Sequence, residues 1–187
     1  MTLIMISLSV GHYLRNKKIM DQTHLHLLIN HLPIFGSILG GLVLAYGLWT
    51  KSNQTKIAAY YLLIISSIGA GIAYLTGEAA EETVENLQGV LENIIEQHEN
   101  FALYALIGLI ILGLSSFIGL YVTLKKSSLT RTVAIVTLIL SIISFGLVAR
   151  TGYLGGQIRH SEIRSGVNGQ INNSNENNDQ KREKYND

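Results

Sequence analysis

The chain has 187 residues, of which 48% are hydrophobic and only 14% are charged. A soluble domain usually carries about 25% Asp, Glu, Lys and Arg, so roughly half of the usual solvating surface is missing. The absence of cysteine excludes disulfides, thiolate metal sites, iron–sulfur clusters and covalently attached c-type haem. A formal net charge of +1, with no patch of interleaved basic and aromatic residues, argues against nucleic acid as a partner.

Four segments are long and apolar enough to cross a bilayer, which takes about 20 residues for a hydrocarbon layer of ~30 Å. They run over 26–49, 57–76, 101–124 and 132–149, and none contains a charged residue. A soluble helical bundle would need polar outer faces, which these segments lack. The sequence therefore predicts an all-α membrane protein, a four-helix transmembrane bundle with an extracytoplasmic helical segment between spans two and three.

The connections between the predicted spans differ in charge. The two short turns are basic, with Lys51, Lys56, Lys125, Lys126 and Arg131 and no acid. The connection 77–100 is acidic and has no basic residue; its glutamates are Glu78, Glu81, Glu82, Glu85, Glu92, Glu96 and Glu99. Because short cytoplasmic loops collect Lys and Arg, we expect the turns in the cytoplasm and the acidic connection outside. This predicts a bacterial inner-membrane protein with both termini in the periplasm.

We expect the membrane domain to cover residues 23–165. Residues 1–22 form a leader of open status, because Arg15, Lys17 and Lys18 would have to be moved across the membrane. One hypothesis is that translation begins at Met20. Residues 166–187 are rich in Asn, Gln and charge with little to bury, which is typical of a disordered polar tail.

The two halves of the membrane domain resemble each other. Placing His26 over His98 aligns the first and third spans without a gap, and a turn three residues longer then aligns Thr76 with Thr151. Two hairpins repeated in the same orientation would be related by an axis along the membrane normal. The alternative is that any two apolar hairpins look alike.

Histidines gather at the end of the bundle that carries the acidic connection. Apart from His12 in the leader, these are His24, His26, His31, His98 and His160. Five residues correspond to about 140° of rotation around a helix, so we expect His26 and His31 to engage different partners. His160 follows the fourth span by about three helical turns if that helix continues.

A repeating pattern gives His98 a direction. Apolar residues recur at intervals of three and four over 80–98, which predicts a helix with one apolar face. The residues of that face are Ala80, Val84, Leu87, Leu91, Ile94 and His98. We therefore expect the imidazole of His98 to point into the bundle.

Ionisable side chains near hydrocarbon usually mark a ligand site or a pathway. Opposing histidines in a helical bundle are suited to b-type haem, which needs only imidazole nitrogen from the protein. Arg150, at the outer end of span four, would then neutralise a haem propionate. The alternatives are histidines placed at the headgroup level without a ligand, and an Arg150 that snorkels to the interface or pairs with Glu99.

Three stretches of sequence resemble a known family. They are His26-Leu-Leu-Ile-Asn-His31-Leu-Pro33-Ile, Thr76-Gly77-Glu78-Ala79-Ala80, and Gly155-Gly156-Gln157-Ile158-Arg159-His160, with His98 ahead of span three. In this order they are similar to a bacterial four-span membrane domain catalogued as domain of unknown function 2231, over about 23–163. Leu27, where the family often has Pro, and the extra His24 depart from it. The resemblance implies a membrane protein associated with redox modules, and it selects His26, His31, His98 and His160.

These observations predict a membrane electron-transfer protein or respiratory-complex subunit that binds one or two b-type haems near the periplasmic face. Its iron ligands would be His26, His31, His98 and His160, and its partner a periplasmic or membrane redox protein. We expect an electron carrier or subunit more than a stand-alone enzyme, because no triad-like arrangement surrounds a histidine. Two alternatives stay open, a cofactor-free anchoring subunit and a metal-binding protein that uses His with Glu78 or Glu99. A channel is disfavoured, because the middle of each span offers few polar residues.

Overall fold

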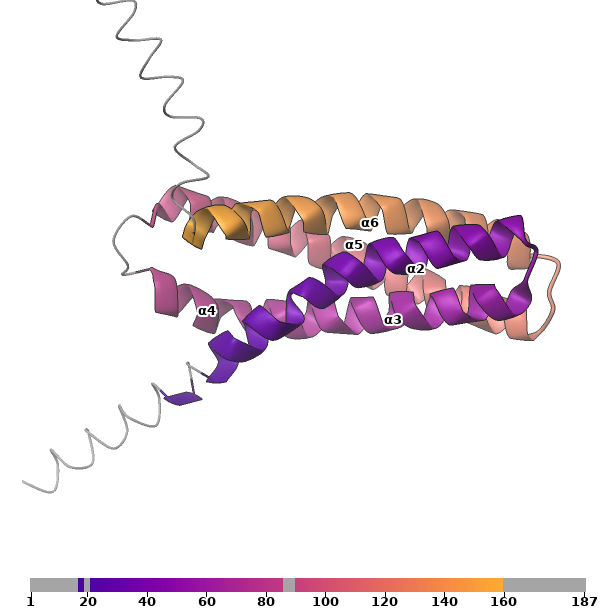
Figure 1. Ribbon diagram of the computed structural model, residues 1–187, viewed down its shortest axis with the longest axis horizontal. Coiled ribbons are helices and arrows are strands. Elements are labelled where there is room, and N and C mark those ends of the chain that lie inside the picture. The colour runs from indigo at the N-terminus through magenta and orange to yellow at the C-terminus, as the bar shows by residue number, and fades with distance from the viewer. Residues whose placement is uncertain (1–16, 19–20, 86–89, 160–187) are drawn as a thin grey trace, which may run out of the picture.

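The computed structural model describes residues 17–18, 21–85 and 90–159. Residues 21–29 are helical and lead through Asn30 into α2 (His31–Trp49), since Asn30 keeps helical dihedral angles of −59° and −22°. The elements that follow are α3 (Asn53–Leu75), α4 (Gly77–Val84), α5 (Glu92–Leu124) and α6 (Thr130–Arg159). Figure 1 shows the four long helices side by side in one elongated bundle.

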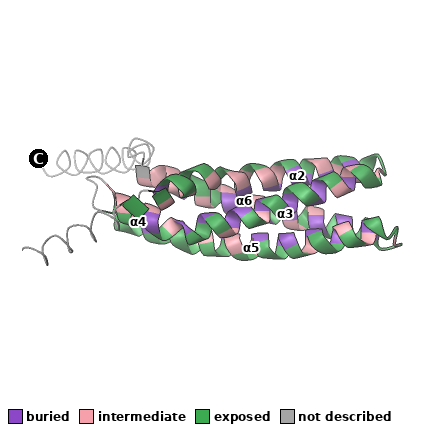
Figure 2. Cartoon of the chain, turned by 90° about the horizontal axis from the view of Figure 1, so that it is seen from below, coloured by how far each residue is buried: buried purple, intermediate pink, exposed green. Residues whose placement is uncertain are grey.

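Four helices are long and apolar enough to cross a membrane, which confirms the predicted number of spans. They cover Asp21–Trp49, Asn53–Leu75, Glu92–Leu124 and Thr130–Ile158. Exposed residues cover the outer surface along the length of the bundle (Figure 2), and many of them are large and apolar, with Leu28 74% and Leu75 79% exposed. Such a surface is suited to lipid and not to water. The chain is therefore an all-helical membrane protein.

The helices form a four-membered ring. α2 packs against α3 and α6, and α5 packs against the same two helices, so α2 and α5 lie on one diagonal. Neighbouring helices are antiparallel, because short turns connect α2 to α3 and α5 to α6 (Figure 1). Two equivalent hairpins packed around a common axis would give this arrangement, so it is compatible with the repeat that the sequence suggests.

The two hairpins close in the same way at the end that carries the basic turns, called the basic end from here on. Lys51 and Lys126 are the second residues after α2 and α5, and both adopt left-handed φ angles, of 54° and 52°. This conformation is common just after a helix C-terminus. The turns span 50–52 and 125–129, so the second turn is two residues longer than the first.

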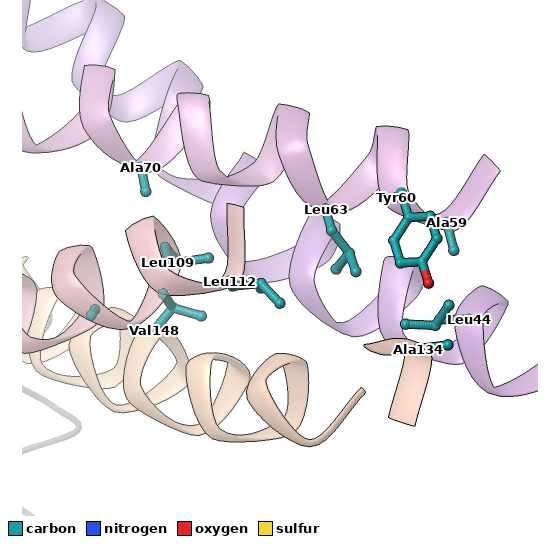
Figure 3. Close-up of a cluster of buried hydrophobic side chains, with 10 residues drawn as sticks. Leu44, Ala59, Tyr60, Leu63, Ala70, Leu109, Leu112, Ala134 and Val148 are labelled. Atoms are coloured by element: carbon teal, nitrogen blue, oxygen red, sulfur yellow. The ribbon is translucent and has the colours of Figure 1, made fainter. Parts of the chain in front are cut away.

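The core is built from leucines and small residues. Leu44, Leu63, Leu109 and Leu112 are fully buried together with Tyr60 (Figure 3). A methyl group added at Gly119 would collide with the Tyr60 ring, which shows how closely that ring lies on α5. Small residues permit such approaches between helices in a membrane, where packing replaces the hydrophobic drive.

Buried hydroxyl groups link the helices. The Ser141 hydroxyl of α6 donates to the Ser37 carbonyl oxygen of α2 at 2.8 Å, and the Ser66 hydroxyl of α3 donates to the Pro33 carbonyl oxygen at 3.2 Å. The spans therefore hold more buried polar groups than the sequence indicates at first sight. Because these hydroxyls donate to backbone carbonyls of neighbouring helices, they hold the helices together.

The continuous helix predicted over 80–98 is wrong. Helix α4 ends at Val84 and α5 begins at Glu92, after Leu91 in an extended conformation with φ −106° and ψ 120°. The pattern predicts that Ala80 and Ile94 face inward. In the structure their neighbours Ala79 and Ile95 are the buried ones, at 7% and 5% exposure. The chain has to reverse so that α5 packs beside α3, and an unbroken helix would carry it away from the bundle.

Candidate functional site

His26 is fixed against the end of α3. Its Nδ1 atom lies 2.8 Å from the Ala73 carbonyl oxygen. A carbonyl oxygen only accepts hydrogen bonds, so Nδ1 carries the proton and Nε2 of the neutral ring carries a lone pair. A methyl group built on Gly77 would lie 3.7 Å from Cε1 of the ring. The first helix thus presents a half-buried imidazole in one defined tautomer.

His98 is held in the same manner in the second hairpin. Its Nδ1 atom lies 2.9 Å from the Thr151 carbonyl oxygen of α6, so the same argument assigns the proton to Nδ1. A methyl group on Gly155 would lie 3.1 Å from Cε1 and 3.3 Å from Nδ1, so a side chain there would press on the ring. The inward direction predicted for His98 is therefore correct, although the continuous helix used to predict it is not.

The two imidazoles lie at the same end of the bundle, the end that carries α4, called the acidic end from here on; together they are called the histidine cluster. His26 bonds to Ala73 close to the C-terminus of α3, and His98 bonds to Thr151 in the last third of α6. The depth of each histidine can be compared by counting residues to the C-terminal end of its helix. His26 lies 24 residues before Thr50, the C-cap of α2, and His98 lies 27 residues before Lys125, the C-cap of α5. At 1.5 Å per residue, His98 lies about one helical turn further out along its helix.

Two other histidines lie outside this cluster. His31 is exposed, and its Nδ1 atom is 3.3 Å from the Leu27 carbonyl oxygen of its own helix. His24 is also exposed. His26 and His31 therefore engage different surroundings, as their spacing predicts. His160 lies outside the described residues, although α6 continues as far as Arg159.

Arg150 is exposed and lies between two aromatic rings. Its guanidinium carbon is 5.6 Å from the ring centroid of Phe101 and 5.4 Å from that of Tyr153. A cation over aromatic faces is held electrostatically without a carboxylate partner. This position at the acidic end resembles interfacial snorkelling, and it keeps the charge available to an anionic group nearby.

Two contacts at this end have no clear signal in the sequence. Thr23 donates to the Ala79 carbonyl oxygen at 2.9 Å and lies 2.9 Å from the Thr83 hydroxyl, which ties the helix of His26 to α4. The carboxyl groups of Glu81 and Glu99 form a hydrogen bond between α4 and α5. Spacing in the sequence gave no reason to pair these residues, because the pairing depends on how the chain reverses between the two helices.

The closeness of Glu81 and Glu99 changes the acid–base chemistry of the acidic end. The hydrogen bond to Glu99 raises the pKa of Glu81 to about 7, and burial together with the negative charges of Glu99, Glu85 and Glu78 acts in the same direction. Because two neighbouring carboxylates do not both ionise readily, Glu81 keeps its proton to a higher pH than an ordinary glutamate does. Glu81 of α4 therefore exchanges its proton near pH 7, and its partner Glu99 directly follows His98 in α5.

The acidic end offers two imidazoles as donors to a cofactor. In the part of the chain that the structure describes, no group of three or more His, Asp or Glu side chains is arranged to hold a metal ion. Two imidazoles, each oriented through Nδ1 so that Nε2 carries the lone pair, are the protein ligands that a b-type haem requires. His26 and His98 each supply one imidazole with its Nδ1 bonded to a carbonyl oxygen, and Glu78 and Glu99 do not complete a metal site with them.

The fold and this cluster define a four-span helical membrane protein with paired histidines at one end. The chain matches the family of predicted membrane proteins DUF2231 over residues 22–164, and it belongs to that family. No curated protein and no solved structure matches it.

Proposed function

We propose that this protein binds b-type haem through His26 and His98 and transfers electrons at the acidic end of the bundle, as a carrier or as a subunit of a respiratory complex. The observation that carries the proposal is the matched orientation of the two rings. Each donates its Nδ1 proton to a backbone carbonyl oxygen of the neighbouring helix, at 2.8 and 2.9 Å. Such bonds fix a ligand ring and increase the basicity of its Nε2 atom.

Haem would supply reversible one-electron chemistry, and the chain would supply position and electrostatics. The Ala73 and Thr151 carbonyl oxygens hold the two rings, and Gly77 and Gly155 leave room beside them. Arg150 offers a positive charge at the same end for a propionate. A second haem would need His31 and His160, which requires His31 to act from the outer face of the bundle.

Charge and aromatic residues support a location in the bacterial inner membrane with the acidic end in the periplasm. The basic end carries Lys51, Lys125, Lys126 and Arg131, as the cytoplasmic side of a membrane protein does. Exposed aromatic residues lie near both ends of the spans, as in interfacial belts; they are Tyr46, Trp49 and Tyr121 at one end, and Tyr74, Tyr104 and Tyr153 at the other. His26 bonds to the residue before Tyr74, so the cluster lies at the interface, within reach of a periplasmic or membrane redox partner.

Absorption spectra of the purified full-length protein test the proposal. Expressed with ample haem and held in detergent, the protein should show the sharp reduced-state bands of a six-coordinate b-type haem. His26→Ala and His98→Ala should each lose most of the bound haem, whereas His24→Ala, an exposed control in the same helix, should retain it. Haem retained by the double variant His26→Ala/His98→Ala would overturn the assignment of ligands. Wild-type protein without haem would overturn the proposal in favour of an anchoring subunit.

A further inference from the structure

A groove between α5 and α6 lies away from the histidine cluster. It has a volume of about 370 Å³ and is lined by Ile111, Leu114 and Ile118 of α5 and by Val133, Val136 and Leu140 of α6. Its volume falls within the range of ligand sites, about 300–1,000 Å³. The Ser115 hydroxyl in its wall is already paired with the Thr137 hydroxyl at 2.7 Å. The groove therefore suits an apolar chain.

The groove leads toward positive charge. Ile111, Ser115 and Ile118 lie on one face of α5, and the same spacing of three and four continues through Val122 to Lys125. Lys125 and Lys126 are exposed, and the segment 125–131 contains Arg131 as a third cation and no acid. An apolar groove that ends at a cluster of cations matches the two parts of an anionic phospholipid, an acyl chain and a phosphate.

The other basic turn differs in both respects. Lys56 is buried there and donates to the Asn53 side-chain oxygen at 2.9 Å, which leaves Lys51 as its exposed lysine. A methyl group on Gly47 would lie 3.0 Å from Lys56, so α2 and α3 meet closely at that point. The charge and the groove thus coincide at α5 and α6, and the α2–α3 turn provides a natural control.

We propose that the groove between α5 and α6 binds one anionic phospholipid, with an acyl chain along Ile118 and Val136 and the phosphate at Lys125 and Lys126. This site is independent of haem binding. The groove would hold the acyl chain and the lysines would hold the negative headgroup. A zwitterionic lipid, which has no net negative charge, should therefore bind less tightly. Removal of one lysine near the phosphate should weaken binding about fivefold.

Native mass spectrometry of the full-length protein, with phosphatidylglycerol or phosphatidylcholine added to the detergent, tests this site. We expect wild type to retain one phosphatidylglycerol with about tenfold or greater preference over phosphatidylcholine. Lys125→Gln/Lys126→Gln should abolish that preference, whereas Lys51→Gln should preserve it. Val136→Trp, which fills the groove, should reduce retention of phosphatidylglycerol, whereas Ile142→Trp on the exposed face of α6 should not.

Three results would overturn the proposal. Equal loss of lipid in the Lys51 variant would show that binding follows net charge and needs no groove. Unchanged retention in Val136→Trp would show that the acyl chain lies elsewhere. A change of oligomeric state in Val136→Trp, with lipid retention intact, would show that a second copy of the chain occupies the groove.

Discussion

The imidazole of His98 donates its Nδ1 proton to the carbonyl oxygen of Thr151 across 2.9 Å, which fixes the ring between two helices of one hairpin. His26 makes the equivalent bond to Ala73 in the other hairpin. Four elements are needed to place these two rings at one end of the bundle, so the cluster depends on the packing of the helices as well as on the residues themselves.

The glycine beneath His98 should matter more than the glycine beneath His26. In Gly155→Ala the new methyl group would lie 3.1 Å from the ring and displace it, whereas in Gly77→Ala it would lie at an ordinary contact distance of 3.7 Å. We expect Gly155→Ala to shift the reduced-state bands and lower haem affinity severalfold, and Gly77→Ala to behave like wild type. Titration of the apoprotein with haem measures both, and equal affinities would contradict the arrangement at His98.

The Glu81–Glu99 pair should make stability depend on pH. The pKa of Glu81 is raised to about 7 from an ordinary value of 4.5, so the folded protein holds this proton more tightly than the unfolded chain does. The stabilisation is fully present below about pH 4.5 and is lost as the pH rises through 7. The Tm in detergent should therefore fall between pH 5 and pH 8.

A matched pair of variants isolates this effect. Glu81→Gln mimics the protonated carboxyl and should flatten the dependence of Tm on pH, whereas Glu82→Gln, an exposed residue of the same helix, should keep it. A slope that survives in Glu81→Gln would show that another group titrates.

Gly119 should be intolerant of a side chain. In Gly119→Ala the methyl group would collide with the fully buried Tyr60 ring, and overpacking of this kind costs about 1–3 kcal/mol. Gly146→Ala is the control, because nothing lies within 4 Å of its added methyl group. That variant should be neutral or more stable by about 0.5–1 kcal/mol, since alanine favours helix. Unfolding curves of the two variants in one detergent should therefore separate clearly, and coincident curves would show that Tyr60 moves without cost.

Gly41 and Ser141 should be coupled. A methyl group on Gly41 would collide with the Ser141 hydroxyl oxygen but lie 3.4 Å from its Cβ atom, so Gly41→Ala should destabilise wild type and leave a Ser141→Ala background nearly unchanged. Ser141→Ala alone should cost roughly 0.6 kcal/mol, a typical value for a hydrogen bond between membrane helices. A double-mutant cycle measures the coupling, and additive effects would place the two helices further apart than the structure has them.

The sequence predicts the membrane spans well, because a span depends on the hydrophobicity and charge of one continuous segment. Long uncharged segments bounded by Lys51 and by Glu78 specify four spans, because a helix is the cheapest way to cross hydrocarbon. The extended conformation of Leu91 just before α5 is not predicted, since it depends on how α5 is placed beside α3. The spacing of His26 and His31 predicts different surroundings for the two rings, but it does not tell which of them contacts a neighbouring helix; in the structure it is His26.

By itself, the sequence determined a membrane protein with four spans, basic turns at one end and histidines at the other, because these properties depend on local hydrophobicity and charge. Tertiary structure alone decided which backbone carbonyls His26 and His98 bond to, that Glu81 meets Glu99, and that α5 and α6 leave a groove. These contacts join residues that are far apart in the chain, and their geometry is set by how small side chains allow the helices to approach.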